Sequence, residues 1–224
     1  MIRPPEPRHL KLSEIFLSIQ GEGTRAGMPC IFVRLHGCGL RCTWCDTPYA
    51  LDHRKGGEWK SFGEIRQEIE SHAGRFVEFT GGEPLEQPEI HSLIRELLDD
   101  GYTVAVETGG HIDLSECDPR LIRIVDFKAP DSGMTKRNCY ENIQLLTNRD
   151  EVKIVCASLE DYEWGKSLIL EHDLSNRVAA VLISPAFGQV DPLPLVEAIL
   201  RDRLNVRFQL QLHKFIWEPD ARGV

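Results

Sequence analysis

Short runs of β-branched and other apolar residues that alternate with helical patterns constrain the fold of this 224-residue chain more than any other feature. Strands and helices that follow one another in this way predict parallel βαβ units. About six such units are too few for a closed eight-stranded barrel, so we expect an α/β fold, a partial and open (β/α)6-type TIM barrel. The expected strands cover residues 31–35, 76–79, 103–106, 122–127, 152–155, 178–183 and 206–212.

Helix signals stand between several of these runs. Ser61 begins a Ser-x-x-Glu capping box, and Ser158 begins a similar start signal. Apolar residues at helical spacing over 90–97 predict a helix that ends at Gly101. A late helix is expected over 193–200 from the same kind of spacing.

Composition excludes several classes of protein. Hydrophobic residues make up 42% and charged residues 27% of the chain, as in ordinary globular domains. The chain has no apolar run of about 18 residues that would predict a membrane span, and residues 1–14 lack the apolar core of a secretion signal. We therefore expect a cytoplasmic protein without a membrane partner. A formal net charge of -9 argues against a broad nucleic-acid surface.

Three cysteines with the spacing Cys38-x3-Cys42-x2-Cys45 follow the first expected strand. Three thiolates on one loop suit a [4Fe-4S] cluster, in which one iron keeps an open position for the amino and carboxylate groups of a ligand. Zinc is the alternative, with His36 as a nearby fourth ligand, although structural zinc sites usually show four ligands in paired spacings. The remaining cysteines are interpreted as small buried hydrophobes: Cys30, Cys117, Cys139 and Cys156.

Several other polar motifs follow expected strands. Thr80-Gly81-Gly82-Glu83-Pro84 comes directly after strand 76–79, and ETGG, DFKAPDSG and ISPAFG come after later strands. In folds of this kind the chemistry gathers at the carboxyl ends of the strands. On its own, a TGGEP segment is equally typical of a plain turn before a helix.

Three further features suggest a ligand near the cysteines. Segment 18–23, SIQGEG, suits either a tight loop with polar side chains that face a ligand or a solvated turn. Arg34 lies among apolar residues of a strand and needs an anionic partner, which is either a carboxylate substrate or an internal ion pair. Thr47 follows the cysteine loop, and its hydroxyl suits a hard ion such as Mg²⁺, or else a turn.

The cysteine spacing, with TGGEP one βαβ unit later, resembles the radical SAM superfamily. Within it, the segments SIQGEG, FVRL, CGLRCTWCDT, TGGEPL, ETGG, DFKAPDSG and QLHKFIW resemble the 7-carboxy-7-deazaguanine synthase (QueE) family, from about residue 12 to residue 224. The resemblance implies one radical SAM domain over 1–224. An N-terminal extension with the substrate loop is expected at 1–29, and the partial barrel and C-terminal tail at 30–224.

The resemblance also implies an activity. Members of this family are homodimeric carbon–nitrogen lyases of queuosine (a tRNA modification) and deazapurine biosynthesis. They convert 6-carboxy-5,6,7,8-tetrahydropterin to 7-carboxy-7-deazaguanine with release of ammonia. Their cluster donates an electron to S-adenosylmethionine (SAM), which releases a 5′-deoxyadenosyl radical and is later regenerated, and they need Mg²⁺. A reducing partner such as flavodoxin or ferredoxin is implied.

Expected residue roles follow from the same resemblance. The cluster ligands are Cys38, Cys42 and Cys45, and the Mg²⁺ ligand is Thr47. SAM contacts are expected from Trp44, Cys45, Asp46, Gly82, Glu83, Asp126, Phe127, Lys128, Ser184, Pro185, Ala186 and Phe187. Substrate contacts are expected from Ile19, Gln20, Gly21, Glu22, Arg34, Thr80, His213 and Val224. The segment Asp126–Lys128 departs from the Ser-Pro-Lys that some members carry.

Two other interpretations remain open. A radical SAM activating enzyme, which places a glycyl radical on a protein partner, would share the chain length, the cysteine spacing and a TGGEP-like motif, but it has no need of SIQGEG, Arg34 or Thr47. A zinc-stabilised module that binds a protein or RNA is the second. The net charge of -9 and the lack of interleaved aromatic and basic residues argue against RNA.

Overall fold

The computed structural model describes residues 8–219 and 221–224, and within them nine strands form one sheet. The strands are β1 (His9–Ile19), β2 (Pro29–Leu35), β3 (Glu58–Ser61), β4 (Phe76–Gly81), β5 (Thr103–Thr108), β6 (Ile122–Asp126), β7 (Glu151–Cys156), β8 (Ala180–Pro185) and β9 (Arg207–Phe208). The α-helices are α1 (Phe62–Ser71), α2 (Ile90–Asp99), α3 (Leu159–Glu171), α4 (Leu174–Arg177), α5 (Pro192–Asp202) and α6 (His213–Ile216).

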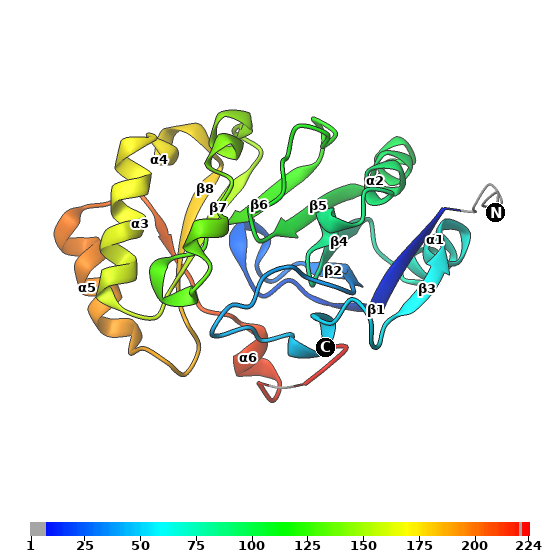
Figure 1. The fold of residues 1–224 in the computed structure, drawn as a ribbon, viewed down its shortest axis with the longest axis horizontal. Helices are drawn as coiled ribbons and strands as arrows, with labels where there is room; N and C mark the ends of the chain where they lie inside the picture. Colours follow the sequence, from blue (N-terminus) through cyan, green and yellow to red (C-terminus); the bar gives the residue numbers. More distant parts are fainter. Residues whose placement is uncertain (1–7, 220) are drawn as a thin grey trace.

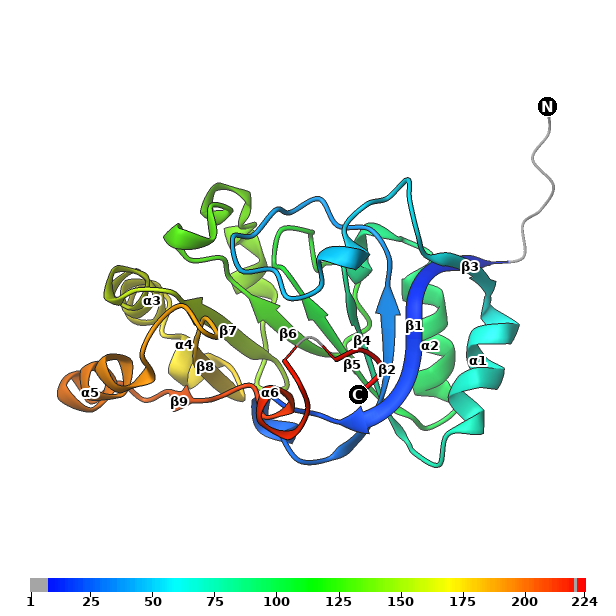
Figure 2. The same cartoon turned by 90° about the horizontal axis from the view of Figure 1, so that it is seen from below.

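The sheet is a curved, open half-barrel. Its strand order is β3-β1-β2-β4-β5-β6-β7-β8-β9, so β3 and β9 form its two edges. Every neighbouring pair from β2 to β9 is parallel, whereas β1 is antiparallel to both β2 and β3. The helices α1, α2, α3 and α5 lie on the outer side, and the C-terminal segment crosses the hollow inner side (Figures 1 and 2). The expected partial (β/α)6-type barrel is confirmed.

Two strands and one boundary differ from the expectation. The sequence pattern does not predict β1 or β3, because the antiparallel pairing that orders them leaves most of β1 only half-buried and β3 without a buried residue. The expected strand over 206–212 is confirmed only at β9, and the prediction of a strand over 209–212 is wrong. Gln209 turns its side chain away to bind the segment after β1, where Gly23 N donates to Gln209 Oε1 at 2.6 Å and Gln209 Nε2 donates to Glu22 Oε2 at 3.0 Å.

The predicted helix starts are confirmed. Ser61 Oγ accepts a hydrogen bond from Glu64 N at 3.3 Å, while Glu64 Oε2 accepts one from Ser61 N at 2.8 Å, and this reciprocal pair begins α1. Ser158 Oγ accepts from Asp161 N at 3.2 Å and begins α3. Helix α2 ends just before Gly101, whose φ of +80° favours glycine. Helix α5 covers the late helix.

Buried residues form one large and one small cluster. The large one packs the sheet against the outer helices, and the small one covers part of the inner face with Cys30, Phe32, Phe76, Ala105, Ile122 and Ile124. Successive side chains of a strand point to opposite faces. Val77 and Phe79 of β4 therefore join the outer core, while Glu78 and Thr80 face the inner side, where they line a cavity. The inner face thus carries polar groups above a small apolar floor.

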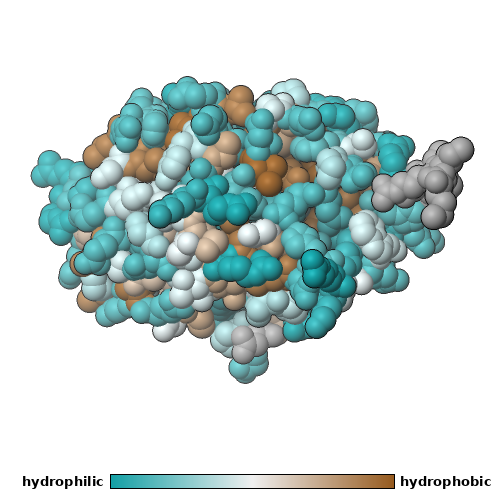
Figure 3. Space-filling model, in the orientation of Figure 1, coloured by the Kyte–Doolittle hydropathy of each residue, from teal (hydrophilic) through white to brown (hydrophobic). Residues whose placement is uncertain are grey.

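The surface drawn in Figure 3 is mostly hydrophilic, with small brown areas between teal and white residues. Among the described residues, no helix combines the length and the apolar character needed to cross a membrane.

Candidate active site

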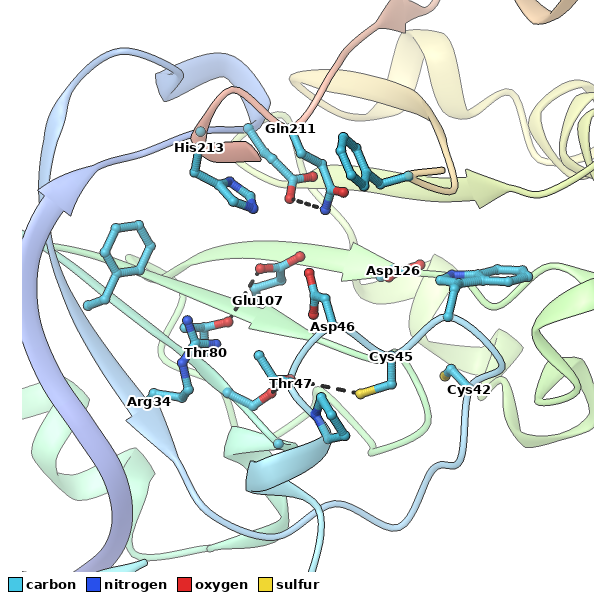
Figure 4. Close-up of a pocket in the computed structure, with 18 of the residues that line it drawn as sticks. Arg34, Cys42, Cys45, Asp46, Thr47, Thr80, Glu107, Asp126, Gln211 and His213 are labelled. Carbon is cyan, nitrogen blue, oxygen red and sulfur yellow. Dashed lines mark hydrogen bonds between the residues drawn. The ribbon is translucent and has the colours of Figure 1, made fainter. Parts of the chain in front are cut away.

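A cavity of about 730 Å³ occupies the inner side of the half-barrel. Side chains from the cysteine loop, from β2, β4, β5 and β6, and from the C-terminal segment converge on it (Figure 4). The expected site residues that line it are Ile19, Gln20, Gly21, Glu22, Arg34, Cys38, Cys42, Trp44, Cys45, Asp46, Thr47, Thr80, Gly82, Glu83, Asp126, Lys128, Ala186, Phe187, His213 and Val224. Phe127, Ser184 and Pro185 do not line it.

The three cysteines lie on the loop after β2, and all three face this cavity. Thr43 fixes the loop, because Thr43 N donates to Ser132 O at 3.2 Å and Thr43 Oγ1 donates to Asp131 O at 2.9 Å. Within the described chain, no other cysteine lines the cavity. Three soft thiol ligands around one space, without a fourth, fit a [4Fe-4S] cluster that keeps one iron open.

Burial raises the pKa of Cys38 to about 12 and also raises that of Cys42, where the Lys128 ammonium opposes the rise. Iron coordination must therefore overcome a preference for the neutral thiol. No three His, Cys, Asp or Glu side chains in residues 8–219 and 221–224 are placed to hold a single metal ion. A [4Fe-4S] cluster makes a different demand, because each thiolate binds its own iron.

The TGGEP segment docks on the start of the cysteine loop. Gly82 N donates to Leu35 O at 3.1 Å, and Glu83 N donates to Gly37 O at 2.8 Å. Gly81 has a φ of +119°, a conformation that residues with a Cβ rarely adopt. The two motif loops are therefore held as one unit at the ends of β2 and β4.

Glu83 is buried, and the protein itself binds its carboxylate. Thr108 Oγ1 and Leu85 N donate to Oε1 at 2.8 and 3.1 Å, and Gly109 N donates to Oε2 at 2.8 Å. His111 Nδ1 lies 3.5 Å from Oε2. Burial raises the pKa of Glu83, and the electrostatic interaction with His111 and these hydrogen bonds oppose the rise. Since a carboxylate accepts about four hydrogen bonds, roughly one position stays open to a ligand.

The segment after β1 is tied to β7 and to the C-terminal segment through Glu22. Lys153 Nζ contacts Glu22 Oε2 at 2.6 Å, and Gln211 Nε2 donates to Glu22 Oε1 at 3.1 Å. Gln20 is buried and its amide is oriented by two partners, because Oε1 accepts from Glu22 N at 3.0 Å and Nε2 donates to Glu78. The SIQGEG segment is thus an ordered loop with polar groups at the cavity.

Arg34 makes the internal ion pair that its sequence context allows. Its Nε lies 2.7 Å from Glu14 Oε1, which also accepts from Tyr49 Oη at 2.7 Å. The two Nη atoms of Arg34 make no hydrogen bond within the described residues, so they can still bind an anion in the cavity. Thr47 Oγ1 is near a backbone carbonyl oxygen, Gly81 O, at 3.4 Å.

The segment after β6 contributes two of its three expected residues. Lys128 Nζ contacts Asp126 Oδ2 at 2.7 Å, and both side chains line the cavity. Asp126 Oδ1 is buried without a hydrogen-bond partner among the described residues, which leaves it available to a ligand. Phe127 instead packs in the outer core and stacks on Tyr140, so its side chain points away from the cavity.

The C-terminal segment covers one side of the cavity. A Cβ on Gly21 would lie 2.5 Å from His213 Nδ1, so this close approach requires glycine. Burial lowers the pKa of His213. Lys214 Nζ lies 3.5 Å from Asp46 Oδ2, and residues 221–224 line the cavity as well. In Figure 4, His213 faces the cavity from the side opposite Arg34.

Three charged strand residues of the cavity receive no role from the sequence, although one of them begins the ETGG motif: Glu78, Glu107 and Lys153. Lys153 Nζ contacts Glu107 Oε1 at 2.7 Å. Burial alone would raise the pKa of Glu107, but the charge and hydrogen bond of Lys153, together with the charges of Lys128 and Arg34, outweigh burial and lower that pKa to about 2. A signal does exist in the sequence, because all three stand at alternating positions inside otherwise apolar strands.

Comparison with known proteins places this site in a class. The model of the radical SAM superfamily matches residues 32–126. The crystal structure of QueE from Escherichia coli superposes with a TM-score of 0.74 at 24% identity, covering 92% of this chain and 95% of that one. Streptococcus suis SuiB bound to its precursor peptide superposes with a TM-score of 0.54 at 14% identity, covering 78% of this chain and 46% of that one. The fold and the three-cysteine loop define a radical SAM protein.

Sequence relatives narrow the class further. A 7-carboxy-7-deazaguanine synthase of Chlorobaculum tepidum is 48% identical over 218 residues, which cover 96% of this chain and 97% of that protein. The corresponding synthase of Koribacter versatilis is 41% identical over 229 residues, with 96% and 100% covered. The chain belongs to the 7-carboxy-7-deazaguanine synthase family of radical SAM enzymes. Membership implies a [4Fe-4S] cluster and SAM, and it does not favour a glycyl-radical activating enzyme.

Proposed function

We propose that this enzyme converts 6-carboxy-5,6,7,8-tetrahydropterin to 7-carboxy-7-deazaguanine with release of ammonia, as a step of queuosine and deazapurine biosynthesis. The convergence of the cysteine loop, the TGGEP segment and the SIQGEG loop on one cavity is the observation that carries the proposal. A volume of about 730 Å³ suits a cofactor and a small heterocycle side by side.

When bound, the cluster on Cys38, Cys42 and Cys45 and the SAM beside it supply the 5′-deoxyadenosyl radical that removes hydrogen from carbon 6 of the substrate. The protein orients SAM through residues around the cysteine loop and along the strand ends. The proposed SAM contacts that line the cavity are Trp44, Cys45, Asp46, Gly82, Glu83, Asp126, Lys128, Ala186 and Phe187. No SAM contact is proposed for Phe127, Ser184 and Pro185, which do not line the cavity.

Substrate binding is assigned to the opposite side of the same cavity. The free Nη atoms of Arg34 would bind the substrate carboxylate, and Thr80 and Gln20, which line the same cavity, would contact the ring. Further contacts are proposed for Ile19, Gly21, Glu22, His213 and Val224. We also propose that Thr47 binds Mg²⁺, which would stabilise charge on a substrate oxygen as the ring contracts.

The residues of the C-terminal segment exclude water from the reacting atoms. His213 and residues 221–224 line one side of the cavity, and Lys214 joins that segment to Asp46 of the cysteine loop. Hydrogen abstraction from one carbon by a radical depends on close positioning and on the exclusion of water more than on acid–base groups.

The wider assembly is proposed on the same basis. The chain would act as one radical SAM domain in a cytoplasmic homodimer that receives electrons from flavodoxin or ferredoxin. Size-exclusion chromatography with light scattering tests the dimer, and an elution as monomer at micromolar concentration would contradict it.

The decisive experiment is an anaerobic assay of the reconstituted protein with SAM, dithionite and the carboxytetrahydropterin, with and without Mg²⁺. We expect 7-carboxy-7-deazaguanine and ammonia without any protein partner, and a higher rate with Mg²⁺. Cys42→Ala provides the control, since it should lack both iron and SAM cleavage. Bound zinc at one per chain, without absorbance near 400 nm, would contradict the proposal.

A further inference from the structure

Glu78 is a buried carboxyl group in the floor of the cavity, and no motif points to it. In the sheet it stands in register with Phe32 of β2 and Ala105 of β5, two members of the small apolar cluster on the inner face. Its Oε2 accepts a hydrogen bond from Gln20 Nε2 at 2.5 Å. Within the described residues this is the only hydrogen bond of the Glu78 side chain.

Three carboxyl groups share this floor with one ammonium group. Lys153 Nζ contacts Glu22 Oε2 at 2.6 Å and Glu107 Oε1 at 2.7 Å, and it makes no such contact with Glu78. Lys153 therefore pairs directly with Glu22 and Glu107, and its charge acts on Glu78 only from a distance. A third carboxylate placed on an apolar layer without a cation is strongly disfavoured, so that uptake of a proton by Glu78 is the favourable alternative.

Taken together, the surroundings of Glu78 raise the pKa of its carboxyl group. Burial raises the pKa of Glu78 to about 8, and Glu107 on β5 and Glu22 on the loop after β1 add to the rise. The hydrogen bond from the loop amide and the Lys153 ammonium on β7 oppose it. On β2, burial raises the pKa of the Cys30 thiol, which therefore stays neutral.

We propose that Glu78 is a specificity-determining residue, which accepts the Gln20 hydrogen bond through one oxygen and donates its own hydroxyl hydrogen to an acceptor on the substrate ring. The proposal rests on the proposed function, because it takes a pterin as the ligand. Gln20 supports it geometrically. Its Oε1 is committed to Glu22 N at 3.0 Å, so its Nε2 is the atom turned toward Glu78.

The pattern of donors and acceptors in the floor matches one edge of a pterin. A 2-amino-4-oxo edge presents two N–H donors beside one carbonyl acceptor. The ionised Glu107 suits the donors, and the protonated Glu78 suits the carbonyl oxygen. A 4-amino ring presents an N–H donor at the position of the carbonyl, and a donor facing the Glu78 hydroxyl leaves both unpaired. Glu78 would therefore select 4-oxo over 4-amino ligands at neutral pH.

Isothermal titration of the reconstituted, SAM-loaded enzyme without reductant tests this selection. The ligands are the carboxytetrahydropterin and its 2,4-diamino analogue, measured between pH 6 and pH 9. For a group with a pKa of about 8, wild-type affinity for the 4-oxo ligand should fall about tenfold from pH 7 to pH 9, while affinity for the 4-amino analogue rises. Glu78→Gln keeps an acceptor for Gln20 and a donor for the ligand, so its affinities should not follow this trend.

The difference between wild type and Glu78→Gln cancels any titration of the ligand itself. Glu163→Gln, on the exposed face of α3, is the matched control and should keep the wild-type profile. Equal iron content and equal SAM affinity establish that Glu78→Gln is folded. The same pH dependence in wild type and Glu78→Gln would overturn the proposal for Glu78. No binding of the carboxypterin at any pH would instead contradict the proposed function.

Discussion

Gly82 and Gly37 meet backbone to backbone: a Cβ on Gly82 would lie 2.0 Å from the Gly37 carbonyl oxygen. The same oxygen accepts the hydrogen bond from Glu83 N at 2.8 Å. Because Gly37 directly precedes the first cysteine, this contact sets the distance between the cysteine loop and the TGGEP segment. The two halves of the proposed SAM site are therefore joined at a point where only glycine fits.

Gly82→Ala should separate these two loops. The added methyl group meets backbone that cannot move aside, so we expect a loss of about 1–3 kcal/mol in the free energy of unfolding, as for other overpacked sites. SAM affinity, measured by titration calorimetry, should fall with it. Gly63→Ala is the matched control, because its Cβ would meet nothing nearer than Ser61 Oγ at 3.9 Å. Wild-type SAM affinity in Gly82→Ala would contradict this account of the contact.

Arg34→Lys should separate the ion pair from the proposed binding of substrate. A lysine can keep a charge contact with Glu14 but loses the two Nη groups that face the cavity. We expect the KM for the carboxytetrahydropterin to rise about tenfold or more, which corresponds to loss of a charge-assisted hydrogen bond. Reductive cleavage of SAM without substrate should stay unchanged. Arg66→Lys, at a surface ion pair, serves as control, and an unchanged KM in Arg34→Lys would refute the assignment.

The parallel strands and helix starts are predictable from the sequence because they depend on local signals. The Ser61 and Ser158 caps need only residues three apart, and strand β2 and the strands from β4 to β8 need only their apolar runs. In contrast, β1 depends on pairing with β2 and β3, and the chain just after β9 binds the segment after β1, 186 residues away in the sequence. Such long-range contacts leave no local pattern.

The residues of the candidate site also differ in whether a local sequence pattern predicts them. The motif loops are recognisable because their glycines and cysteines occur together in short segments. Glu78 and Lys153 lie in apolar strands outside the motifs, and Glu107 is the strand residue at the start of ETGG. A period of two cannot distinguish a side chain that faces a cavity from one that faces solvent. Only the curvature of the sheet in the folded half-barrel shows that these three side chains lie on its inner face.

Ser158→Ala should weaken the protein without changing its chemistry. Ser158 Oγ accepts the hydrogen bond from Asp161 N that begins α3, and loss of such a cap costs about 1 kcal/mol of stability. Urea unfolding measures this loss, and kcat for the carboxytetrahydropterin should not change. Ser167→Ala is the control within the same helix, since its hydroxyl contacts only the Glu163 carbonyl. Equal stability of the two variants would show that the cap contributes nothing.

Lys153→Met should destabilise the enzyme most at neutral pH. Lys153 is the only cation that contacts Glu107 in the described chain, and its removal leaves two half-buried carboxylates uncompensated, which should cost less than the about 3–5 kcal/mol of fully buried pairs. The charge and hydrogen bond of Lys153, with smaller contributions from Lys128 and Arg34, outweigh burial and hold the pKa of Glu107 at about 2, below its ordinary value of 4.5. The stability from this pair is therefore present above pH 4.5 and is lost as the pH falls toward 2.

The difference in unfolding free energy between wild type and Lys153→Met should accordingly shrink on acidification, because the variant has already lost what acid removes from the wild type. Urea titrations at several pH values from 3 to 7 measure it. Lys166→Met, which removes a surface ammonium paired with Asp202, should show a smaller effect at neutral pH. A difference between wild type and Lys153→Met that stays constant down to pH 3 would mean that Lys153 stabilises the cavity through its packing, and not through the charge of Glu107.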